Sequence, residues 1–366
     1  MVKNESRFVV TIAGKEIEAD RPEPIVSDID VIPYNRRMGP RVAVDALVDG
    51  AFVLPVDFYS SGLAILNELK RFLETKYTDA SFQGQRDLRS VFRELSHRLL
   101  LEVSNNRLRV KKAPEIGWLK QLYPELNDFL LPLPQIQGLN SSWQWHQKGI
   151  SIPVLERKIH PFYGTYFPTR FEHLKLFETW LKQYKGEKKS AFDIGAGCGV
   201  LSFQLLKHGF GKVYATDSNP NAIIGLTEDL TKNRLVSKID LKHGDLFVQP
   251  DSKTELIVFN PPWLPASHQL EGMDRAIYYD ASLFPRFFAE APKYLKPGGR
   301  VVLLFSNLLQ LINPGESHPI EKELSGNERL TKELFMQMKV GTASKKTTRD
   351  QNWRAHEHVE LWVLRN

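Results

Sequence analysis

The sequence predicts an α/β protein in which a doubly wound parallel sheet follows a mainly helical N-terminal part. After about residue 160, short apolar segments alternate with segments of helical length. A glycine-rich turn follows the first of these apolar segments, at 195–199. Two long amphipathic stretches occur earlier, at 61–76 and 85–101. Strands that alternate with helices form a parallel sheet, because each helix returns the chain to the start of the next strand.

The C-terminal part is expected to form one α/β domain over residues 160–366. Its strands are short apolar runs bounded by turn residues. They are expected at 190–194, 212–216, 239–242, 255–259, 300–305 and 358–364. Helices are expected at 199–208, 220–233 and about 282–295, and a turn at 295–299.

The N-terminal part is expected to form an accessory domain over residues 1–140. A strand pair is expected at 7–19, with its turn near Gly14, and the two amphipathic stretches are expected to be helices. A hairpin at 100–110, with Asn105-Asn106 as its turn, completes the outline of a winged-helix-like module. Proline, asparagine and serine are frequent at 130–142, where we place the start of the connection, and residues 141–159 are assigned to the linker.

The composition is that of a globular protein of two domains. Of its 366 residues, 42% are hydrophobic and 25% are charged. The formal net charge of +6 permits a polyanionic partner but does not require one. The one cysteine excludes an intrachain disulfide. The sequence shows neither a secretion signal nor an apolar run of membrane-spanning length, so we expect a cytoplasmic protein with no membrane association.

The glycine-rich turn predicts a binding loop for an electron-rich ligand. Gly195, Gly197 and Gly199 lie between an expected strand and an expected helix. Without a Cβ atom the backbone can approach a ligand closely, and the helix start offers free N–H groups. A dinucleotide-binding loop would have glycine where Val200 stands. Asp193 at the loop entrance would repel a pyrophosphate and attract the ammonium of a methionine moiety, so the loop disfavours a dehydrogenase.

Carboxylates follow the next two strands. Asp217 lies 24 residues after Asp193, where a carboxylate can accept both hydroxyls of a ribose. Asp245 follows the third strand and can accept from the exocyclic amine of an adenine, with Leu246 or Phe247 against the ring. One such residue alone would suit a helix cap or a turn. Their joint order with the glycine loop predicts an adenosine-containing cofactor.

The fourth strand ends in Asn260-Pro261-Pro262-Trp263, which predicts a site for a planar nitrogen group. The lone pair of an amide or nucleobase amine is delocalised, and two hydrogen-bond acceptors would free it. The Asn260 side-chain oxygen and the Pro261 carbonyl are these acceptors. The prolines add no competing N–H donor and stiffen the loop, and Trp263 can stack on the target.

These motifs, in this order, resemble the class I S-adenosylmethionine-dependent methyltransferases, in particular the small methyltransferase branch. That branch includes enzymes similar to release-factor glutamine methyltransferases and to nucleic-acid methyltransferases of exocyclic amines. The resemblance covers about residues 160–366 and implies a Rossmann-like seven-stranded sheet and S-adenosyl-L-methionine as cofactor. It also implies a lid over the cofactor at 163–170, with Tyr166, Phe167 and Thr169 as candidates. The family usually has tyrosine or phenylalanine where Trp263 stands.

The sequence therefore predicts an S-adenosylmethionine-dependent N-methyltransferase with Asn260, Pro261 and Trp263 as catalytic residues. The expected cofactor-binding residues are Asp193, Gly195, Gly197, Gly199, Asp217, Asp245, Phe247, Asn260 and Thr169. No metal is expected.

The identity of the methyl acceptor stays open. An exocyclic amine of RNA, or less readily of DNA, comes first, then a glutamine amide in a protein, then a small molecule or peptide. A non-catalytic cofactor-binding regulator is disfavoured because Asn260-Pro261-Pro262 is intact. Residues 1–140 are expected to select the substrate, and the sequence makes no prediction of the oligomeric state.

Two basic groups are possible contacts to a polyanion, although a solvated surface is the default for both. The first is a stripe along the helix at 85–101, formed by Arg86, Arg89, Arg93 and His97. The second lies in the loop before the last strand and consists of Lys345, Lys346, Arg349 and Arg354.

Overall fold

The computed structural model describes residues 9–12, 14–79, 82–248, 253–266, 276–326, 329–341 and 356–366. The chain forms two compact units. One consists of Met1–Val9 and Arg21–Gln147, and the other of Val10–Asp20 and Lys148–Asn366. The basic loop at 345–354 lies outside the described residues, as does the side chain of Arg86.

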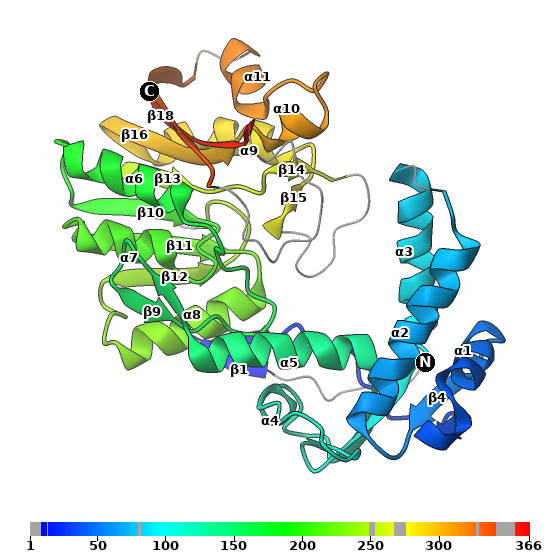
Figure 1. The fold of residues 1–366 in the computed structure, drawn as a ribbon. Coiled ribbons are helices and arrows are strands. Elements are labelled where there is room, and N and C mark those ends of the chain that lie inside the picture. Colours follow the sequence, from blue (N-terminus) through cyan, green and yellow to red (C-terminus); the bar gives the residue numbers. More distant parts are fainter. Residues whose placement is uncertain are drawn as a thin grey trace. The chain divides into compact units, whose positions relative to one another are not determined.

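The second unit contains the predicted seven-stranded sheet (Figure 1). Its strand order is β12-β11-β10-β13-β16-β18-β17. The first five strands in this order are parallel, and β18 runs antiparallel to both of its neighbours. The bounds are β10 (Ser190–Ile194), β11 (Lys212–Asp217), β12 (Ile239–His243), β13 (Thr254–Phe259), β16 (Leu295–Ser306), β17 (Thr331–Lys339) and β18 (His358–Arg365).

Two details of this sheet differ from the sequence prediction. β17 was not predicted, because its side chains are mostly exposed on both faces and show no apolar alternation. The turn predicted at 295–299 lies inside β16, which begins at Leu295 and pairs irregularly with β13 at its start. Gly298 still has a positive φ of 75°, so the local turn chemistry was detected but its place within a strand was not.

Helices cover both faces of the sheet (Figure 1). On one face α6 (Glu172–Gln183), α7 (Val200–Lys207) and α8 (Pro220–Lys232) pack on one buried cluster. On the other, α9 (Leu283–Glu290) and α11 (Pro319–Gly326) pack on a second cluster. Successive strand residues alternate between the two clusters, as Ala191 and Phe192 do, which is the period of a strand buried on both faces.

The first unit contains the predicted helices and hairpin. Its elements are β3 (Val31–Tyr34), α1 (Pro40–Val48), β4 (Phe52–Pro55), α2 (Tyr59–Lys76), α3 (Phe82–Ser96), β5 (Leu100–Ser104), β6 (Arg107–Leu108), α4 (Trp118–Leu122), β7 (Asp128–Pro132) and α5 (Leu133–Lys148). The predicted hairpin is confirmed, because β5 and β6 pair next to a turn in which Asn105 and Asn106 have φ of 50° and 62°. Such angles are typical of a two-residue hairpin turn.

The stretch read as the start of the linker is not a loop. Residues 128–132 form β7, and α5 continues from Leu133. Leu133, Ile136 and Leu139 are fully buried along one face of this helix, and Pro134 lies in its first turn, where proline is tolerated. Local composition suggested a loop, but tertiary burial of this apolar face stabilises a helix. A short hairpin follows, formed by β8 (Ile150–Ile152) and β9 (Arg157–Ile159).

The predicted N-terminal strand pair folds with the second unit instead of with the accessory part. It consists of β1 (Val9–Ile12) and β2 (Lys15–Glu18). At its end, the Asp20 N–H donates to Asn221 Oδ1 at 2.9 Å, and Asn221 Nδ2 donates to the Asp20 carbonyl at 2.7 Å. Asn221 is fully buried at the start of α8. This paired contact fixes the N-terminal segment on the second unit.

We expect Asn221→Ala to lower the free energy of unfolding of the second unit by about 2 kcal/mol. The substitution removes two hydrogen bonds and leaves both backbone groups of Asp20 without their partner. Chemical denaturation followed by circular dichroism measures the change. Lys232→Ala, at an exposed site in the same helix, is the control. Equal stability of the two variants would show that the contact with Asp20 does not hold the N-terminal segment.

Candidate active site at the carboxyl edge of the sheet

The predicted site residues follow neighbouring strands at the same edge of the sheet. Ile194, the last residue of β10, pairs with Thr216 in β11 and with Phe259 in β13. The glycine loop, Asp217 and Asn260 therefore begin at one level, beyond the carboxyl ends of three parallel strands. Ligands of open α/β sheets bind at such an edge.

The glycine loop has a conformation that favours glycine at each of its glycine positions. Gly195, Gly197 and Gly199 have φ of 67°, 53° and 77°. A Cβ atom at Gly199 would lie 2.6 Å from Cδ1 of Leu226, so a side chain there would collide with α8. Gly199 is also the N-cap residue of α7. The loop is thus held against α8 while its backbone stays open to close approach.

Asp217 ties the glycine loop to the next strand. Its Oδ2 accepts from the Gly197 N–H at 2.7 Å, and its Oδ1 accepts from the Asn219 N–H at 2.7 Å. A carboxylate oxygen has a second lone pair, so both oxygens can accept a further hydrogen bond. The carboxylate is therefore positioned by the backbone and can still receive two hydroxyl donors.

Asp193 is fully buried and does not lie at an open loop entrance as expected. It is 0% exposed, and its Oδ2 accepts from the Ser202 hydroxyl on α7 at 2.6 Å. Its Oδ1 is buried and has no hydrogen-bond partner among the described residues. Burial raises the pKa of this carboxyl to about 7, and the nearby charge of Asp217 adds to the shift. This oxygen therefore lacks the hydrogen bond that would offset its burial.

The residues after β12 are placed differently from each other. Asp245 is largely exposed and forms an ion pair with Arg286 of α9, at 2.5 Å between Oδ2 and Nη1. Phe247 is buried in the core, where its ring stacks on Tyr294 at 4.5 Å between centroids with 7° between planes. Asp245 thus lies where a ligand can reach it. The sequence had suggested that Phe247 could lie against an adenine ring. In the structure its ring packs in the core and presents no free face to an adenine.

The loop after β13 carries a contact that the sequence did not reveal. The indole Nε1–H of Trp263 donates to Asn260 Oδ1 at 3.2 Å. Asn260 and Trp263 are both half-buried, and Pro261 is buried. His173 of α6 lies edge-on to the Trp263 ring, at 5.8 Å and 90°. After the loop, β14 (Leu264–Pro265) pairs with β15 (Tyr278–Tyr279), which fixes its exit.

The expected lid segment passes over the glycine loop. A Cβ atom at Gly197 would lie 3.7 Å from the Tyr166 carbonyl, and Asn219 Nδ2 donates to the Gly164 carbonyl at 2.8 Å. Tyr166 and Thr169 are exposed. These contacts hold Gly164 and Tyr166 beside the loop.

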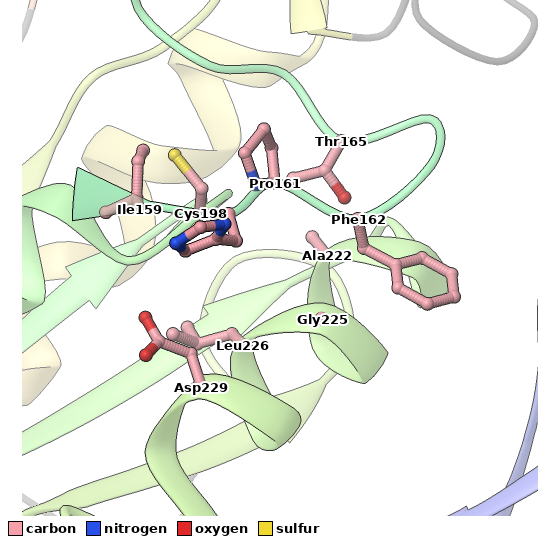
Figure 2. Close-up of a pocket in the computed structure, with 10 residues that line it drawn as sticks. Ile159, Pro161, Phe162, Thr165, Cys198, Ala222, Gly225, Leu226 and Asp229 are labelled. Carbon is pink, nitrogen blue, oxygen red and sulfur yellow. The ribbon is translucent and has the colours of Figure 1, made fainter. Parts of the chain in front are cut away.

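A pocket lies behind this segment (Figure 2). Thr165 and Cys198 line it together with residues of α8, including Gly225 and Asp229. Its volume is about 10 Å³, which is near the lower limit for a single water molecule. It is therefore a packing gap and does not bind the cofactor.

Sequence reasoning missed His173, Ser202 and Arg286, which contact Trp263, Asp193 and Asp245 respectively. Of these, Ser202 was the easiest to predict from the sequence, because it lies in the first turn of the helix that follows the glycine loop. His173 and Arg286 belong to helices elsewhere in the chain, so only the fold brings them to the site. Among the described residues there is no group of three or more metal-ligating side chains, and no helix is long and apolar enough to cross a membrane.

We expect Asp193→Asn to stabilise the protein at pH 8 by about 4 kcal/mol and far less at pH 4. The pKa of Asp193 is about 7 in the folded state, against 3.8 ordinarily. The unfolded chain therefore loses its proton first as the pH rises, and stability is lost between about pH 4 and pH 7 at ~1.4 kcal/mol per pKa unit. An asparagine does not titrate and still accepts from Ser202. Thermal unfolding of both proteins from pH 4 to pH 8 measures the difference; a gap independent of pH would contradict the burial argument.

Comparisons with known proteins agree with this arrangement. Residues 175–313 match the model of the methyltransferase small domain. A putative protein N5-glutamine methyltransferase of Methanocaldococcus jannaschii is 33% identical over 180 residues, which are 47% of this chain and 84% of that protein. A release factor glutamine methyltransferase of Leptospira interrogans is 30% identical, over 44% of this chain and 64% of that protein.

The other similarities cover a smaller part of the related protein or are more distant. Ribosomal RNA small subunit methyltransferase C of Alcanivorax borkumensis is 34% identical over 33% of each chain. A solved structure of a ribosomal protein L11 methylase from Lactobacillus delbrueckii subsp. bulgaricus is 20% identical, with a TM-score of 0.38, over 56% of this chain and 82% of that one.

Proposed function

Because the chain belongs to the methyltransferase small-domain family, we propose that it methylates the side-chain amide nitrogen of a glutamine in a protein. The enzyme is an S-adenosylmethionine-dependent N-methyltransferase. The observation that carries the proposal is the loop after β13, where the Asn260 amide stands beside two prolines and is held by Trp263. Such a loop offers oxygen acceptors to an NH₂ group.

The residues at the carboxyl edge fit S-adenosylmethionine. The buried Oδ1 of Asp193 has no partner in the described part of the chain, and an ammonium is a donor that would relieve its unfavourable burial. Asp217 has lone pairs left for the ribose hydroxyls, and the second oxygen of Asp245 can accept from the adenine amine. Gly195, Gly197 and Gly199 are proposed to let the backbone approach the cofactor, with Thr169 in the lid.

Nitrogen chemistry explains the choice of Asn260 and Pro261. The cofactor would supply a methyl group from its sulfonium. The S–CH₃ bond breaks and its electron pair stays on the sulfur, the nitrogen lone pair forms the N–C bond, and the nitrogen releases one proton to solvent. An amide nitrogen is a poor nucleophile because its lone pair is shared with the carbonyl. Asn260 Oδ1 and the Pro261 carbonyl are proposed to accept its two N–H groups, which favours tetrahedral geometry. The residues thus act by position and electrostatics, without a strong base.

Two observations favour a protein acceptor, which the sequence alone had ranked second. The relative of Methanocaldococcus jannaschii, of which this chain covers 84%, is named for glutamine N5 methylation. Around the described site the arginines are already paired, Arg286 with Asp245 and Arg170 with Glu357. Such pairing leaves these cations less available to a phosphate backbone.

A nucleobase amine, in RNA more readily than in DNA, is the second candidate. The similarity to ribosomal RNA small subunit methyltransferase C supports it. The basic residues at 345–354 lie outside the described residues, and their sequence also suits a phosphate contact.

Transfer of a labelled methyl group into a lysate distinguishes the two acceptors. For the proposed function, the label should resist nuclease, be released by protease, and appear as N5-methylglutamine after complete enzymatic digestion. Transfer should depend weakly on salt. A nuclease-sensitive product whose formation falls steeply with salt would overturn the protein acceptor and support the nucleobase.

We expect Asn260→Ala to lower kcat by about 100-fold or more while the affinity for the cofactor changes little. An interaction made mainly with the reacting nitrogen affects turnover more than ground-state binding, and loss of one such acceptor has an effect of this order. Asp217→Ala is the contrasting variant, since it should weaken cofactor binding by about ten- to a hundredfold. Calorimetry and single-turnover rates separate the effects. Transfer within a few fold of wild type in Asn260→Ala would refute this role.

The first unit is proposed to select the acceptor, because all the residues assigned to the cofactor and the reacting nitrogen belong to the second unit. The double variant Arg89→Glu/Arg93→Glu tests its exposed basic stripe on α3. We expect a KM for the macromolecular acceptor about two- to tenfold higher, with kcat and cofactor affinity unchanged, as for exposed charge contacts. An unchanged KM would assign the stripe to a solvated face.

A further inference from the structure

Asn260 is useful to the proposed reaction only in one of its two amide orientations. Its side chain ends in an oxygen, which accepts hydrogen bonds, and in an NH₂ group, which donates them. The two ends have nearly the same shape, and rotation about the terminal bond exchanges them. If the Asn260 NH₂ group faced the NH₂ group of the substrate, two hydrogen-bond donors would meet. The reacting nitrogen would then not be held. Something must therefore distinguish the two orientations.

Trp263 supplies the group that distinguishes them. Its Nε1–H can only donate, and it lies 3.2 Å from Asn260 Oδ1. With the amide rotated, this N–H would face an NH₂ group and lose its acceptor. Oδ1 has a second lone pair, so the contact does not prevent it from accepting from a substrate. Phenylalanine, one of the usual residues of the family at this position, has no such donor.

The indole is in turn held by its surroundings. Trp263 packs against the buried clusters on both faces of the sheet. His173 contacts it edge-on at 5.8 Å and is 5% exposed in α6, so neither ring can move far without displacing the core. Burial lowers the pKa of His173 to about 4. The imidazole is therefore neutral near pH 7 and acts by its shape.

We propose that the Trp263 indole N–H locks Asn260 in its oxygen-presenting orientation, and that His173 holds the indole in place. Both act here as positioning residues, because the loop alone does not determine the orientation of the Asn260 side-chain amide. The proposal rests on the proposed function of Asn260, but the lock itself is a property of the free protein. It can therefore be tested with and without the reaction.

The direct test is nuclear magnetic resonance of the indole N–H groups in the full chain. The chain has seven tryptophans, and Trp263→Phe identifies the Trp263 signal by its disappearance. We expect Asn260→Ala to shift that signal and to speed its exchange with water. Asn260→Asp keeps an oxygen acceptor and should retain slow exchange. An unchanged Trp263 signal in Asn260→Ala would overturn the lock, even if Asn260 proves essential for transfer.

The second test is a double-mutant cycle on turnover. Trp263→Phe keeps an aromatic face but removes the donor, and should lower kcat about two- to tenfold with unchanged cofactor affinity. His173→Ala should lower kcat to a similar extent. Because both act through one contact, the double variant should be no slower than the slower single variant. Effects that multiply would show independent roles and overturn the proposal for His173.

A matched control addresses folding. Trp180→Phe makes the same substitution in a buried tryptophan of α6 that packs on Phe177 and Tyr184. It should keep kcat within about twofold despite a lower melting temperature, because loss of core packing acts on stability. If Trp180→Phe lowered kcat as much as Trp263→Phe does, the loss would reflect general loosening of the unit, and the positioning role would fail.

Discussion

The hydrogen bond from the Gly197 N–H to the Asp217 carboxylate joins the loop after β10 to the end of the neighbouring strand β11, at the carboxyl edge of the sheet. The three glycines of the loop have no side chains to fix its backbone, so its shape also depends on contacts with other segments. Leu226 of α8 lies against the same loop at Gly199, and the Tyr166 carbonyl lies beside it at Gly197. The carboxyl edge is thereby assembled from segments far apart in the chain, and a single parallel register sets their common level.

The site keeps polar groups in places that are unfavourable for the free protein. Asp193 is fully buried and His173 is buried, and neither Asp193 Oδ1 nor His173 Nδ1 has a hydrogen-bond partner among the residues that the structure describes. A buried polar atom without a partner destabilises a fold by about 1–3 kcal/mol. Asp193 contacts Ser202 in the helix that follows the glycine loop, and His173 contacts Trp263. Such a pattern is typical of sites at which stability is given up for function.

In the proposed reaction, the loop after β13 acts through rigidity and not through acid–base chemistry. Prolines remove competing donors, the β14–β15 pair fixes the exit, and the Trp263 contact settles the amide of Asn260. A reaction that requires only desolvation, alignment and two acceptors benefits from groups that do not reorganise. His173 adds no charge to this arrangement near pH 7, because burial lowers the pKa of its imidazole to about 4. The proposed catalytic groups all belong to the second unit.

The sequence by itself determined the strand–loop–helix order, the glycine loop, Asp217, and the Asn260-Pro261-Pro262-Trp263 loop, because these depend on local backbone chemistry and on the periods of strands and helices. It also determined α2, α3 and the hairpin at Asn105-Asn106. The tertiary structure alone decided the rest. It placed Phe247 in the core, made a helix of 133–148, added the exposed strand β17, and returned Val10–Asp20 to the second unit through Asn221. It also brought His173 and Arg286 to the site. Burial and contacts between distant segments depend on the packing of the whole chain, which no local pattern of residues encodes.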